Sequence, residues 1–475
     1  MTVSVPGQLR TQAPWRAISG FGGAIRSAGR YVTVTSVKAL QEVMGQARES
    51  GLTIAWRGSG RSYGDAALNS DGLVVDITGM SRILHWDPAA GVIAAEGGVT
   101  IEQLWRRTLP DGFWPAVVPG TMRPTLAGCL SMNIHGKNNF KVGTFGEHVL
   151  DFQLLTPGGA LLTCSREENP DLFHAAVGGL GLLGVVTSLR LRLKRVETGL
   201  LRVKVRVAGT LGELLDIFEA ELPQSDYAVG WVDCMARGRG LGRGILHVAE
   251  DVAADDALRG EHSLSLEAQK LPTSILGVPR ALLWRLMEPL TNDVGVRVIN
   301  ALRYSVSRLQ EGDSYLQSQV AFAFLLDYVP QWWRAYGREG LIQVQVFLPR
   351  AAARGTLETL LQLCQREGLP PYLGVLKRHR PDPFLLSHAL EGWSLAMDFR
   401  VTRANRERLW ALTARVTEQV LDVGGRFYFA KDAVLRSEDV ERMFGAEPLR
   451  QFRALRDTVD PERLLSSGLS RRVLK

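Results

Sequence analysis

Cysteine is scarce in this sequence, and its spacing excludes several classes of protein. The 475 residues contain four cysteines, Cys129, Cys164, Cys234 and Cys364, and no two of them form a CxxC pair. This spacing argues against a zinc ribbon and a thioredoxin-like redox motif, and a disulfide framework is not expected in a chain of this length. We therefore expect a reducing, cytoplasmic setting.

Long apolar runs are missing as well. No stretch reaches the ~18 apolar residues of a spanning helix, and residues 1–23 lack the uninterrupted apolar segment of a signal peptide. There is no internal repeat and no low-complexity segment. We predict a globular chain without a spanning helix, whose membrane association, if any, is peripheral contact at the inner face.

Neither sign of charge is in large excess. Lys and Arg number 56 against 49 Asp and Glu, a net charge of +7 with a pI near 9.3. Without a basic tail or a recognition motif, this excess does not indicate nucleic-acid binding. It suits an anionic cofactor, a phosphorylated substrate or an anionic membrane surface, and it equally suits a solvated basic surface.

Glycine, by contrast, is abundant and unevenly placed. Of the 49 glycines, 28 lie in residues 1–200. Glycine in a folded chain marks tight turns or backbone held close to a neighbour. The length allows two or three domains. The glycine surplus indicates that the first of them contains tight turns or backbone packed closely against a neighbouring group.

Apolar periodicity predicts an α+β fold in two main units. Residues 185–194 and 201–207 alternate apolar and basic residues as half-buried strands do, and a domain boundary is placed between them near 197–200. The second unit reads as an antiparallel sheet flanked by helices. In the first unit we predict helices at 36–49 and 101–109, strands at 52–57, 73–78 and 92–97, and a hairpin around 157–159; in the second, strands at 320–329, 342–349, 372–377 and 393–399 and helices at 210–221, 356–367 and 406–421.

Residues 251–310 show no steady period. An acidic stretch is mixed there with apolar residues that include Leu282, Leu283, Trp284 and Leu286. We hypothesise a mobile cover that docks on a membrane to admit a lipid tail. The alternative is a loop folded over the core of the second domain.

Two glycine patterns match known motifs in residue type and spacing but not in the secondary structure around them. Residues 179–184 read GxGxxG but precede a strand, whereas the dinucleotide-binding fingerprint follows a strand and opens a helix. Residues 60–64 read GxSxG, but no helix follows Ser62 as a nucleophile elbow requires. We therefore expect neither a Rossmann site nor a serine hydrolase.

A third pattern indicates a cofactor loop. Residues 57–65, RGSGRSYGD, lie between two predicted strands, and small residues in such a loop expose backbone N–H groups that bind anions such as a pyrophosphate. Residues 119–128 add further glycine and hydroxyl groups. Taken singly, each loop could equally be a plain turn.

Four motifs in order give a specific resemblance. RGSGRSYGD, VPGT, SMNIHGKNNF with GTFGEHV, and DLFHAAVGGLGLLG resemble in order and spacing the FAD domain of the vanillyl-alcohol-oxidase flavoproteins, which have the PCMH-type fold. IHGKN, GGRFYFAKD and VDPERLLSSGLSRR are similar to one branch, the oxidase subunits of polyprenylphosphoryl-ribose 2-epimerases. The resemblance is thin across 225–320. It implies a two-domain protein: an FAD-binding domain at 1–197, a substrate (cap) domain at 198–426, and a C-terminal segment at 427–475 that returns to the FAD domain.

The resemblance also implies a cofactor site. Covalent members often carry histidine at the position of Arg61, so we expect non-covalent FAD here. Cys129 lies in a cofactor loop but reads more simply as a small packed residue. The residues implied to hold FAD are Gly58, Ser59, Gly60, Arg61, Ser62, Tyr63, Gly120, Thr121, Thr125, Gly128, Ile134, Gly136, Gly181 and Val186.

The expected catalytic residues are Lys431, His135 and Tyr428. Lys431 would approach the N1/O2 edge of the flavin, where a fixed cation stabilises the charge that develops in hydride transfer; from the residues alone it would read as a surface lysine. The candidate base is His135 or a lysine-linked water, although a lone histidine is more often a packed residue. We expect Lys137, Gln345 and Lys377 to bind substrate, since the resemblance implies that Gln345 and Lys377 lie on strands of the substrate pocket. An inward lysine on an apolar strand needs a partner, and a substrate phosphate or the flavin edge is a candidate. No metal site is expected.

The implied activity is FAD-dependent oxidation of a secondary alcohol on a sugar or polyol, with a polyprenyl-phosphate-linked pentose as a candidate substrate. A separate NAD(P)H-dependent reductase would reduce the ketone and complete an epimerisation. Alternatives are an aldonolactone or alditol oxidase and a catalytically idle FAD-binding subunit. Two departures from the branch, Ala396 in place of cysteine and Asn139 in place of histidine, indicate a different pocket wall.

Overall fold

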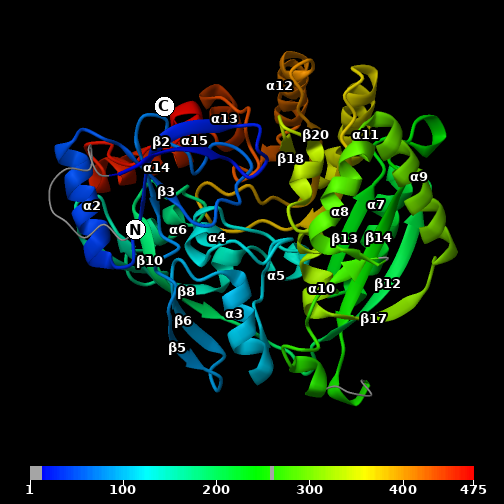
Figure 1. The fold of residues 1–475 in the computed structure, drawn as a ribbon, viewed down its shortest axis with the longest axis horizontal. Helices are drawn as coiled ribbons and strands as arrows, with labels where there is room; N and C mark the ends of the chain where they lie inside the picture. Colours follow the sequence, from blue (N-terminus) through cyan, green and yellow to red (C-terminus); the bar gives the residue numbers. More distant parts are fainter. Residues whose placement is uncertain (1–12, 257–260, 276, 475) are drawn as a thin grey trace.

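The computed structural model describes residues 13–256, 261–275 and 277–474 (Figure 1). The first sheet has strand order β1-β2-β4-β3, and β4 runs parallel to both of its neighbours. Its strand β3 ends at Arg57, where the glycine loop begins. The bounds are β1 (Trp15–Ser19), β2 (Arg26–Thr33), β3 (Ile54–Arg57) and β4 (Leu73–Asp76).

A second, antiparallel sheet lies on the other side of the glycine-rich loops, with strand order β5-β6-β10-β8-β9. The predicted hairpin is confirmed as β8 paired with β9, and a short pair, β7 (Phe113–Trp114) with β11 (Lys194–Arg195), closes one end. The strands are β5 (Ile83–Asp87), β6 (Val92–Glu96), β8 (Val149–Leu155), β9 (Leu161–Ser165) and β10 (Val185–Arg192).

Side-chain caps set the starts of the helices in this part of the chain. Ser36 accepts from the backbone N–H of Ala39, and Thr100 and Gln103 form the predicted capping box. Both helices bury their apolar stripe in the main hydrophobic core. The helices here are α2 (Val37–Glu49), α3 (Ile101–Thr108), α4 (Leu126–Ser131), α5 (Asn139–Val142) and α6 (Pro170–Ala176).

The cap is an antiparallel sheet of strand order β17-β12-β14-β13-β19-β20-β18-β21, which confirms the predicted α+β architecture. Helices α7 (Leu211–Glu221), α11 (Arg350–Arg366) and α12 (Arg406–Asp422) pack on one face, and the other face turns to the cofactor loops. The strands are β12 (Leu200–Ala208), β13 (Tyr227–Val232), β14 (Gly244–Asp251), β17 (Ser314–Ser318), β18 (Leu341–Pro349), β19 (Leu373–His379), β20 (Gly392–Arg400) and β21 (Arg426–Phe427).

Two predictions in this region were wrong. Residues 320–329 are not a strand: Ser318 accepts from the N–H of Ala321 and starts helix α10 (Gln319–Ala323), which the short helix η8 (Leu325–Asp327) follows. Residues 251–310 do contain a regular element: Asn292 caps the 17-residue helix α9 (Asp293–Leu309). Before it lie β15 (Ser274–Ile275), β16 (Val278–Pro279), α8 (Arg280–Met287) and η7 (Glu288–Leu290).

The end of the chain lies against the first sheet, where Figure 1 shows red helices beside blue strands. Residue Ile54 in β3 pairs with Leu465 in a parallel bridge. The helices of this segment are α13 (Ser437–Phe444), α14 (Ala446–Val459) and α15 (Gly468–Val473). We propose the divisions 1–197, 198–426 and 427–475, because the chain moves between the sheets near these positions.

Candidate active site

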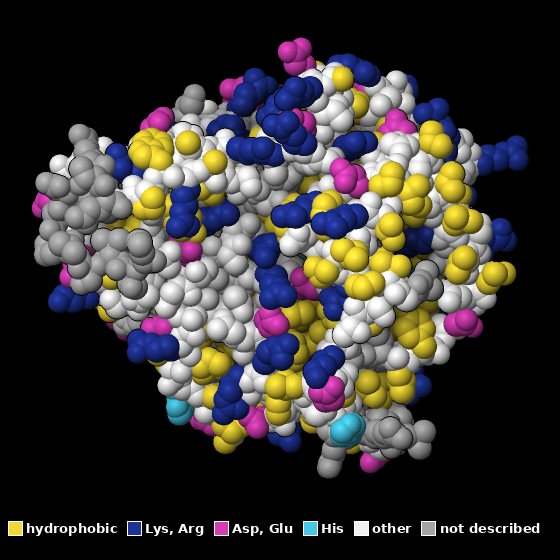
Figure 2. All heavy atoms as spheres, viewed as in Figure 1, with side chains coloured by type: hydrophobic (Ala, Val, Ile, Leu, Met, Phe, Trp, Pro, Cys, Tyr) yellow, Lys and Arg dark blue, Asp and Glu magenta, His cyan; other side chains and the backbone are white. Residues whose placement is uncertain are grey.

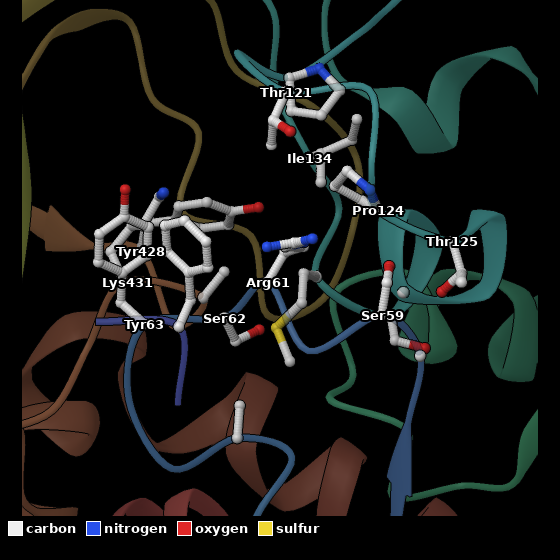
Figure 3. Close-up of a pocket in the computed structure, with 18 of the residues that line it drawn as sticks. Ser59, Arg61, Ser62, Tyr63, Thr121, Pro124, Thr125, Ile134, Tyr428 and Lys431 are labelled. Carbon is white, nitrogen blue, oxygen red and sulfur yellow. The ribbon is translucent and has the colours of Figure 1, made fainter. Parts of the chain in front are cut away.

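A single elongated cavity of about 1680 Å³, including its open mouth, separates the glycine-rich loops from the cap sheet. Figure 3 shows its two ends: Tyr63, Tyr428 and Lys431 gather at one, and Ser59 and Thr125 face each other at the other. Residues of both glycine-rich loops, of the cap sheet and of the segment around Lys431 line it. A long ligand that lies along the loops would therefore leave the end beneath the cap sheet to a second ligand.

The glycine loop after β3 forms one wall of this cavity. Gly60 has φ +64, in the region that favours glycine, and a Cβ on Gly58 would lie 2.1 Å from Thr125 Oγ1 in the second loop. The backbone N–H of Tyr63 donates to the carbonyl of Ala430 (2.8 Å). The glycine loop is thus packed tightly against both the second loop and the segment that carries Lys431.

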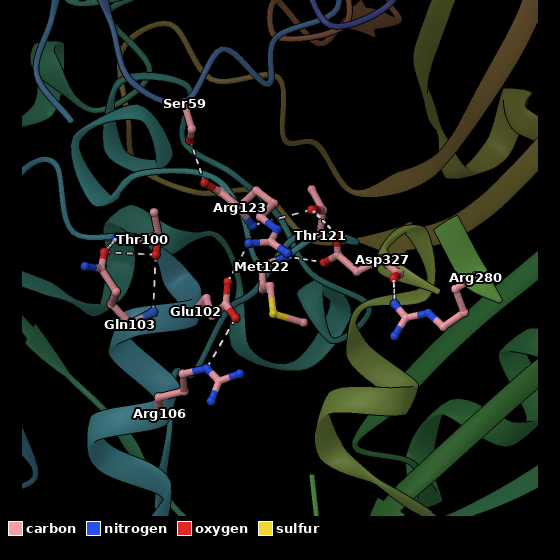
Figure 4. Close-up of polar contacts among 10 residues, drawn as sticks. All are labelled: Ser59, Thr100, Glu102, Gln103, Arg106, Thr121, Met122, Arg123, Arg280 and Asp327. Atoms are coloured by element: carbon pink, nitrogen blue, oxygen red, sulfur yellow. Dashed lines mark hydrogen bonds and ion pairs between the residues drawn. The ribbon is translucent and has the colours of Figure 1, made fainter. Parts of the chain in front are cut away.

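A half-buried aspartate in the cap, Asp327, fixes the second loop (Figure 4). Asp327 accepts from Thr121 Oγ1 (2.9 Å) and from the backbone N–H of Met122 (2.7 Å). On the other side of this loop, Ser59 Oγ donates to the carbonyl of Arg123 (2.5 Å). Burial raises the pKa of Asp327, while its bonds to Met122 and Thr121 oppose that shift.

Four buried polar atoms on the wall of this cavity lack a hydrogen-bond partner among the described residues. They are Trp56 Nε1, Arg61 Nε, Tyr63 Oη and Thr125 Oγ1. Buried polar groups are nearly always paired, so these atoms are placed for a ligand with hydrogen-bonding groups. At Gly58 and at Gly181 (φ +72), the absence of a side chain leaves the backbone open to the cavity. These features together fit a dinucleotide such as FAD.

Lys431 lies at the other end of the cavity. Its Nζ is 3.8 Å from the centre of the Tyr63 ring, a cation–π contact. Burial lowers the pKa of Lys431 to about 7, Asp398 opposes that shift and Lys377 adds to it. An amine at this position is ready to gain positive charge when negative charge comes near it.

A hydrogen-bonded chain of buried side chains runs behind His135. Gln345 Nε2 lies 3.0 Å from His135 Nε2 and 3.2 Å from Ser394 Oγ, and Ser394 Oγ lies 2.7 Å from His379 Nε2. With Gln345 donating, the proton of His135 is on Nδ1, which is 3.5 Å from Lys377 Nζ. Burial, with Lys377, His379 and His388 nearby, holds the pKa of His135 well below its usual range.

Two further lysines line the cavity beneath the cap sheet. Burial lowers the pKa of Lys137 to about 7 and that of Lys377 to about 8. The Nζ of Lys137 donates to the carbonyl of Phe322 and lies 4.3 Å from the centre of its ring. Within the described part of the chain, neither lysine forms an ion pair with a carboxylate. The charge they carry when protonated is left for a ligand to neutralise.

The structure brings nearly all of the predicted site residues to this one cavity. Gly136 is the exception: it is not among the lining residues, and a Cβ there would lie 2.4 Å from Asn138 Oδ1. Those on the wall are Gly58, Ser59, Gly60, Arg61, Ser62, Tyr63, Gly120, Thr121, Thr125, Gly128, Ile134, His135, Lys137, Gly181, Val186, Gln345, Lys377, Tyr428 and Lys431.

Several neighbours were missed that strand periodicity could have found. Side chains two apart on a strand share a face, so Gln343 belongs with Gln345, and His379 with Lys377. The same rule places Ser394 and Asp398 beside Ala396. Asp327 gives no such signal, because its apolar segment predicts a strand.

Comparison with known proteins identifies the family. A profile described as an FAD binding domain matches residues 28–165. The chain is 31% identical over 434 residues to decaprenylphosphoryl-beta-D-ribose oxidase of Mycolicibacterium smegmatis, an alignment that covers 90% of each chain. The protein belongs to the PCMH-type FAD-binding oxidoreductase family.

Other members of this family match over shorter stretches. Cytokinin dehydrogenase 6 of Oryza sativa is 34% identical over 189 residues, 38% of this chain and 36% of the relative. A putative D-arabinono-1,4-lactone oxidase of Neurospora crassa is 28% identical over 159 residues, 34% of this chain and 28% of the relative. The predicted cofactor class, FAD, and the oxidoreductase class are thereby confirmed.

Three further observations concern chemistry outside the flavin. All four cysteines are free and buried. Among the described residues, no group of three or more His, Cys, Asp or Glu side chains is placed to hold a metal ion. No helix in the same part of the chain is both long and apolar enough to cross a membrane.

Proposed function

We propose that this family member oxidises a secondary alcohol of a polyprenyl-phosphate-linked pentose to the ketone. The observation that carries the proposal is the set of three lysines, Lys137, Lys377 and Lys431, that face one cavity without a carboxylate ion pair among the described residues. Such cations are costly unless a ligand supplies negative charge. The name of the Mycolicibacterium smegmatis relative, an oxidase of decaprenylphosphoryl-ribose, supports the same substrate class.

In the reaction, the alcohol loses a hydride from its C–H bond and a proton from its O–H bond. The product is the ketone. FAD supplies the hydride acceptor, its N5 atom. Lys431 is the cation placed to stabilise the negative charge that the reaction adds at the cofactor. Tyr428 packs against His388, with ring centres 4.5 Å apart, and forms part of the wall at this end.

We assign the proton to Lys377 rather than to His135. A general base works best when its pKa lies near the working pH; burial brings the pKa of Lys377 to about 8, whereas that of His135 lies far lower. His135, held by Gln345, positions the amine of Lys377. This differs from the sequence-based hypothesis, which gave His135 first.

We further propose that FAD is bound without a covalent bond. Residue 61 is arginine, whose guanidinium does not bond to a flavin carbon. The thiol of Cys129 is fully buried in α4, burial raises its pKa, and it does not line the cavity. Denaturation with acid should therefore release the flavin into the supernatant.

The ketone would pass to a separate NAD(P)H-dependent reductase, so that the two half-reactions invert one carbon. A soluble aldonolactone or alditol is the second candidate substrate, since a putative lactone oxidase shares part of the chain. A neutral substrate of this kind would leave Lys137 without an anionic partner, because Lys377 accepts the proton and Lys431 faces the cofactor. Lys137 therefore favours the phosphorylated substrate.

Anaerobic mixing separates these alternatives. Purified protein loaded with FAD is mixed with polyprenylphosphoryl ribose, with a free aldonolactone or with an alditol, and the bleaching of the flavin absorbance is followed. We expect bleaching by the phosphorylated lipid and none by the neutral sugars. Bleaching by a neutral sugar alone would assign the second candidate, and bleaching by none of them would favour an idle FAD-binding subunit.

A further inference from the structure

Exposed apolar side chains are concentrated in one segment of the cap. Of the sixteen large apolar side chains that are exposed in the described residues, thirteen lie between Leu282 and Leu325. Isolated exposed apolar residues are ordinary, but a contiguous group marks an interaction surface. Figure 2 shows this group as yellow side chains on the right of the molecule, over α8 and α9 of Figure 1.

Helix α9 contributes an outward apolar face. Val296, Asn300 and Ser307 are its buried residues and face the cap sheet. Val294, Val298, Leu302, Val306 and Leu309 are 53–86% exposed. At about 100° per residue these five lie within an arc of about 120° on the side away from the buried stripe. The helix is therefore apolar toward solvent, the reverse of an ordinary surface helix.

Arginines border this apolar arc on one side. By the same geometry, Arg297 and Arg308 lie between one edge of the arc and the buried stripe. Arg303 lies beside the buried stripe instead, with its guanidinium 4.6 Å from the centre of the Trp231 ring. None of the three forms an ion pair with a carboxylate in the part of the chain that the structure describes. The one acidic residue of the helix, Asp293, accepts from the hydroxyl of Tyr372.

The apolar surface continues from α9 to the mouth of the cavity. Leu286 of α8 and Leu290 of η7 are exposed by 56% and 49%. At the start of α8, Arg280 donates to the carbonyl of Tyr328 (2.6 Å) and to that of Asp327, which fixes α8 against η8. Leu325 of η8 is 51% exposed and lines the cavity.

We propose that the surface of α8, η7 and α9 docks on an anionic lipid bilayer. An apolar arc bordered by arginines is the arrangement of a helix that lies in a membrane interface, where the arginines reach the lipid phosphates. A second copy packed on the same surface about a two-fold axis would bring the unpaired arginines of both copies together. This inference goes beyond the proposed function, because docking does not depend on which alcohol is oxidised.

Vesicle sedimentation tests the docking without any substrate. The FAD-loaded protein is mixed with vesicles of phosphatidylglycerol and phosphatidylcholine, or of phosphatidylcholine alone, and the pelleted fraction is measured. The variant carries Val298→Glu and Leu302→Glu. The matched control carries Leu84→Glu and Leu161→Glu, two equally exposed apolar residues of the FAD-binding domain (50% and 46%).

We expect the unchanged protein and the control to pellet with anionic vesicles and the variant to lose about tenfold in partitioning. Exchange of Arg297 and Arg308 for Gln should weaken binding to anionic vesicles and leave the weak binding to neutral ones unchanged. Flavin absorbance and fluorescence verify that each variant is folded and loaded.

Equal sedimentation of variant and control, or no pelleting of the unchanged protein, would overturn the proposal. Self-association in sedimentation velocity that the α9 variant abolishes, without vesicle binding, would assign the surface to a second copy instead. Flavin reduction by the phosphorylated substrate in detergent is measured separately, so a failure of docking is distinct from a failure of the proposed activity.

Discussion

At the scale of single residues, burial of Lys377 in this site lowers the stability of the FAD-free protein. Burial lowers its pKa to about 8 against a normal value of 10.5. Between these two values the unfolded chain binds more protons than the folded one, so the stability of the FAD-free protein rises with pH from about 8 to 10.5. Below about pH 8 the full loss of stability caused by burying Lys377 is present.

Lys377→Met should therefore stabilise the FAD-free protein at pH 7 by about 1–3 kcal/mol. It should also flatten the rise of stability between pH 8 and 10 and abolish flavin reduction by the phosphorylated substrate. Urea denaturation at pH 7 and 9.5 measures the first two effects. Lys38→Met, at a side chain that is 85% exposed, is the control and should change little. A destabilised Lys377→Met protein at pH 7 would contradict this account.

At the scale of elements, the loop after β3 depends on the absence of one side chain. A Cβ at residue 58 would meet Thr125 Oγ1 at 2.1 Å and Thr125 Cβ at 3.2 Å, and Thr125 is fixed at the start of α4. Gly58→Ala should force the two cofactor loops apart and lower FAD affinity at least about tenfold.

Titration of the FAD-free variant with FAD, followed by flavin fluorescence, measures this loss. Gly45→Ala is the matched control: Gly45 lies inside α2, and apart from its chain neighbours and the adjacent backbone of that helix no atom lies within 4 Å of the position that a Cβ would take there. That exchange should leave FAD affinity unchanged and add about 0.5–1 kcal/mol of stability, since alanine favours a helix. Equal FAD affinity in both variants would show that the close packing of Gly58 against Thr125 is not needed for FAD binding.

The elements also show what local patterns could and could not predict. Caps and alternation gave α2, α3 and the β8–β9 hairpin, because each is decided by residues close together in the chain. Residues 320–329 are apolar almost throughout, and such a run has no period that separates strand from helix; Ser318 decided it. In α9 the apolar residues face outward, so the usual rule of an inward apolar face concealed a regular helix.

The site was more predictable than the fold around it, and for a different reason. Its glycines and Lys431 lie in motifs of an FAD-binding family, so resemblance placed them in one cavity although they are far apart in sequence. The chain of Gln345, Ser394 and His379 is invisible to motifs, because it exists only where β18, β20 and β19 lie side by side. Pairing of distant strands is a tertiary property that one sequence does not state.

At the scale of the whole molecule, three distant parts of the chain meet at Arg472. This residue of α15 donates to Asp65 Oδ1 (2.8 Å), at the end of the glycine loop, and to Asp432 Oδ2 (2.7 Å), next to Lys431. It also donates to the carbonyl of Leu435. The C-terminal helix thereby ties the end of the glycine loop to the segment that carries Lys431.

Arg472→Met should lower both stability and FAD affinity. Removal of the guanidinium leaves Asp432, 6% exposed, and the half-buried Asp65 without their cation, at a cost of about 3 kcal/mol. Thermal and urea unfolding measure the stability, and flavin fluorescence measures the affinity. Arg450→Met in α14, whose partner Glu447 is exposed, is the control and should cost at most about 1 kcal/mol.

A third variant separates the charge from the shape of Arg472. Adding Asp65→Asn and Asp432→Asn to Arg472→Met removes the uncompensated carboxylates, so part of the lost stability should return. FAD affinity should stay low, because the C-terminal helix then no longer ties the glycine loop to the Lys431 segment. If FAD affinity returns together with stability, the C-terminal helix supports the fold alone and does not set the geometry of the cofactor site.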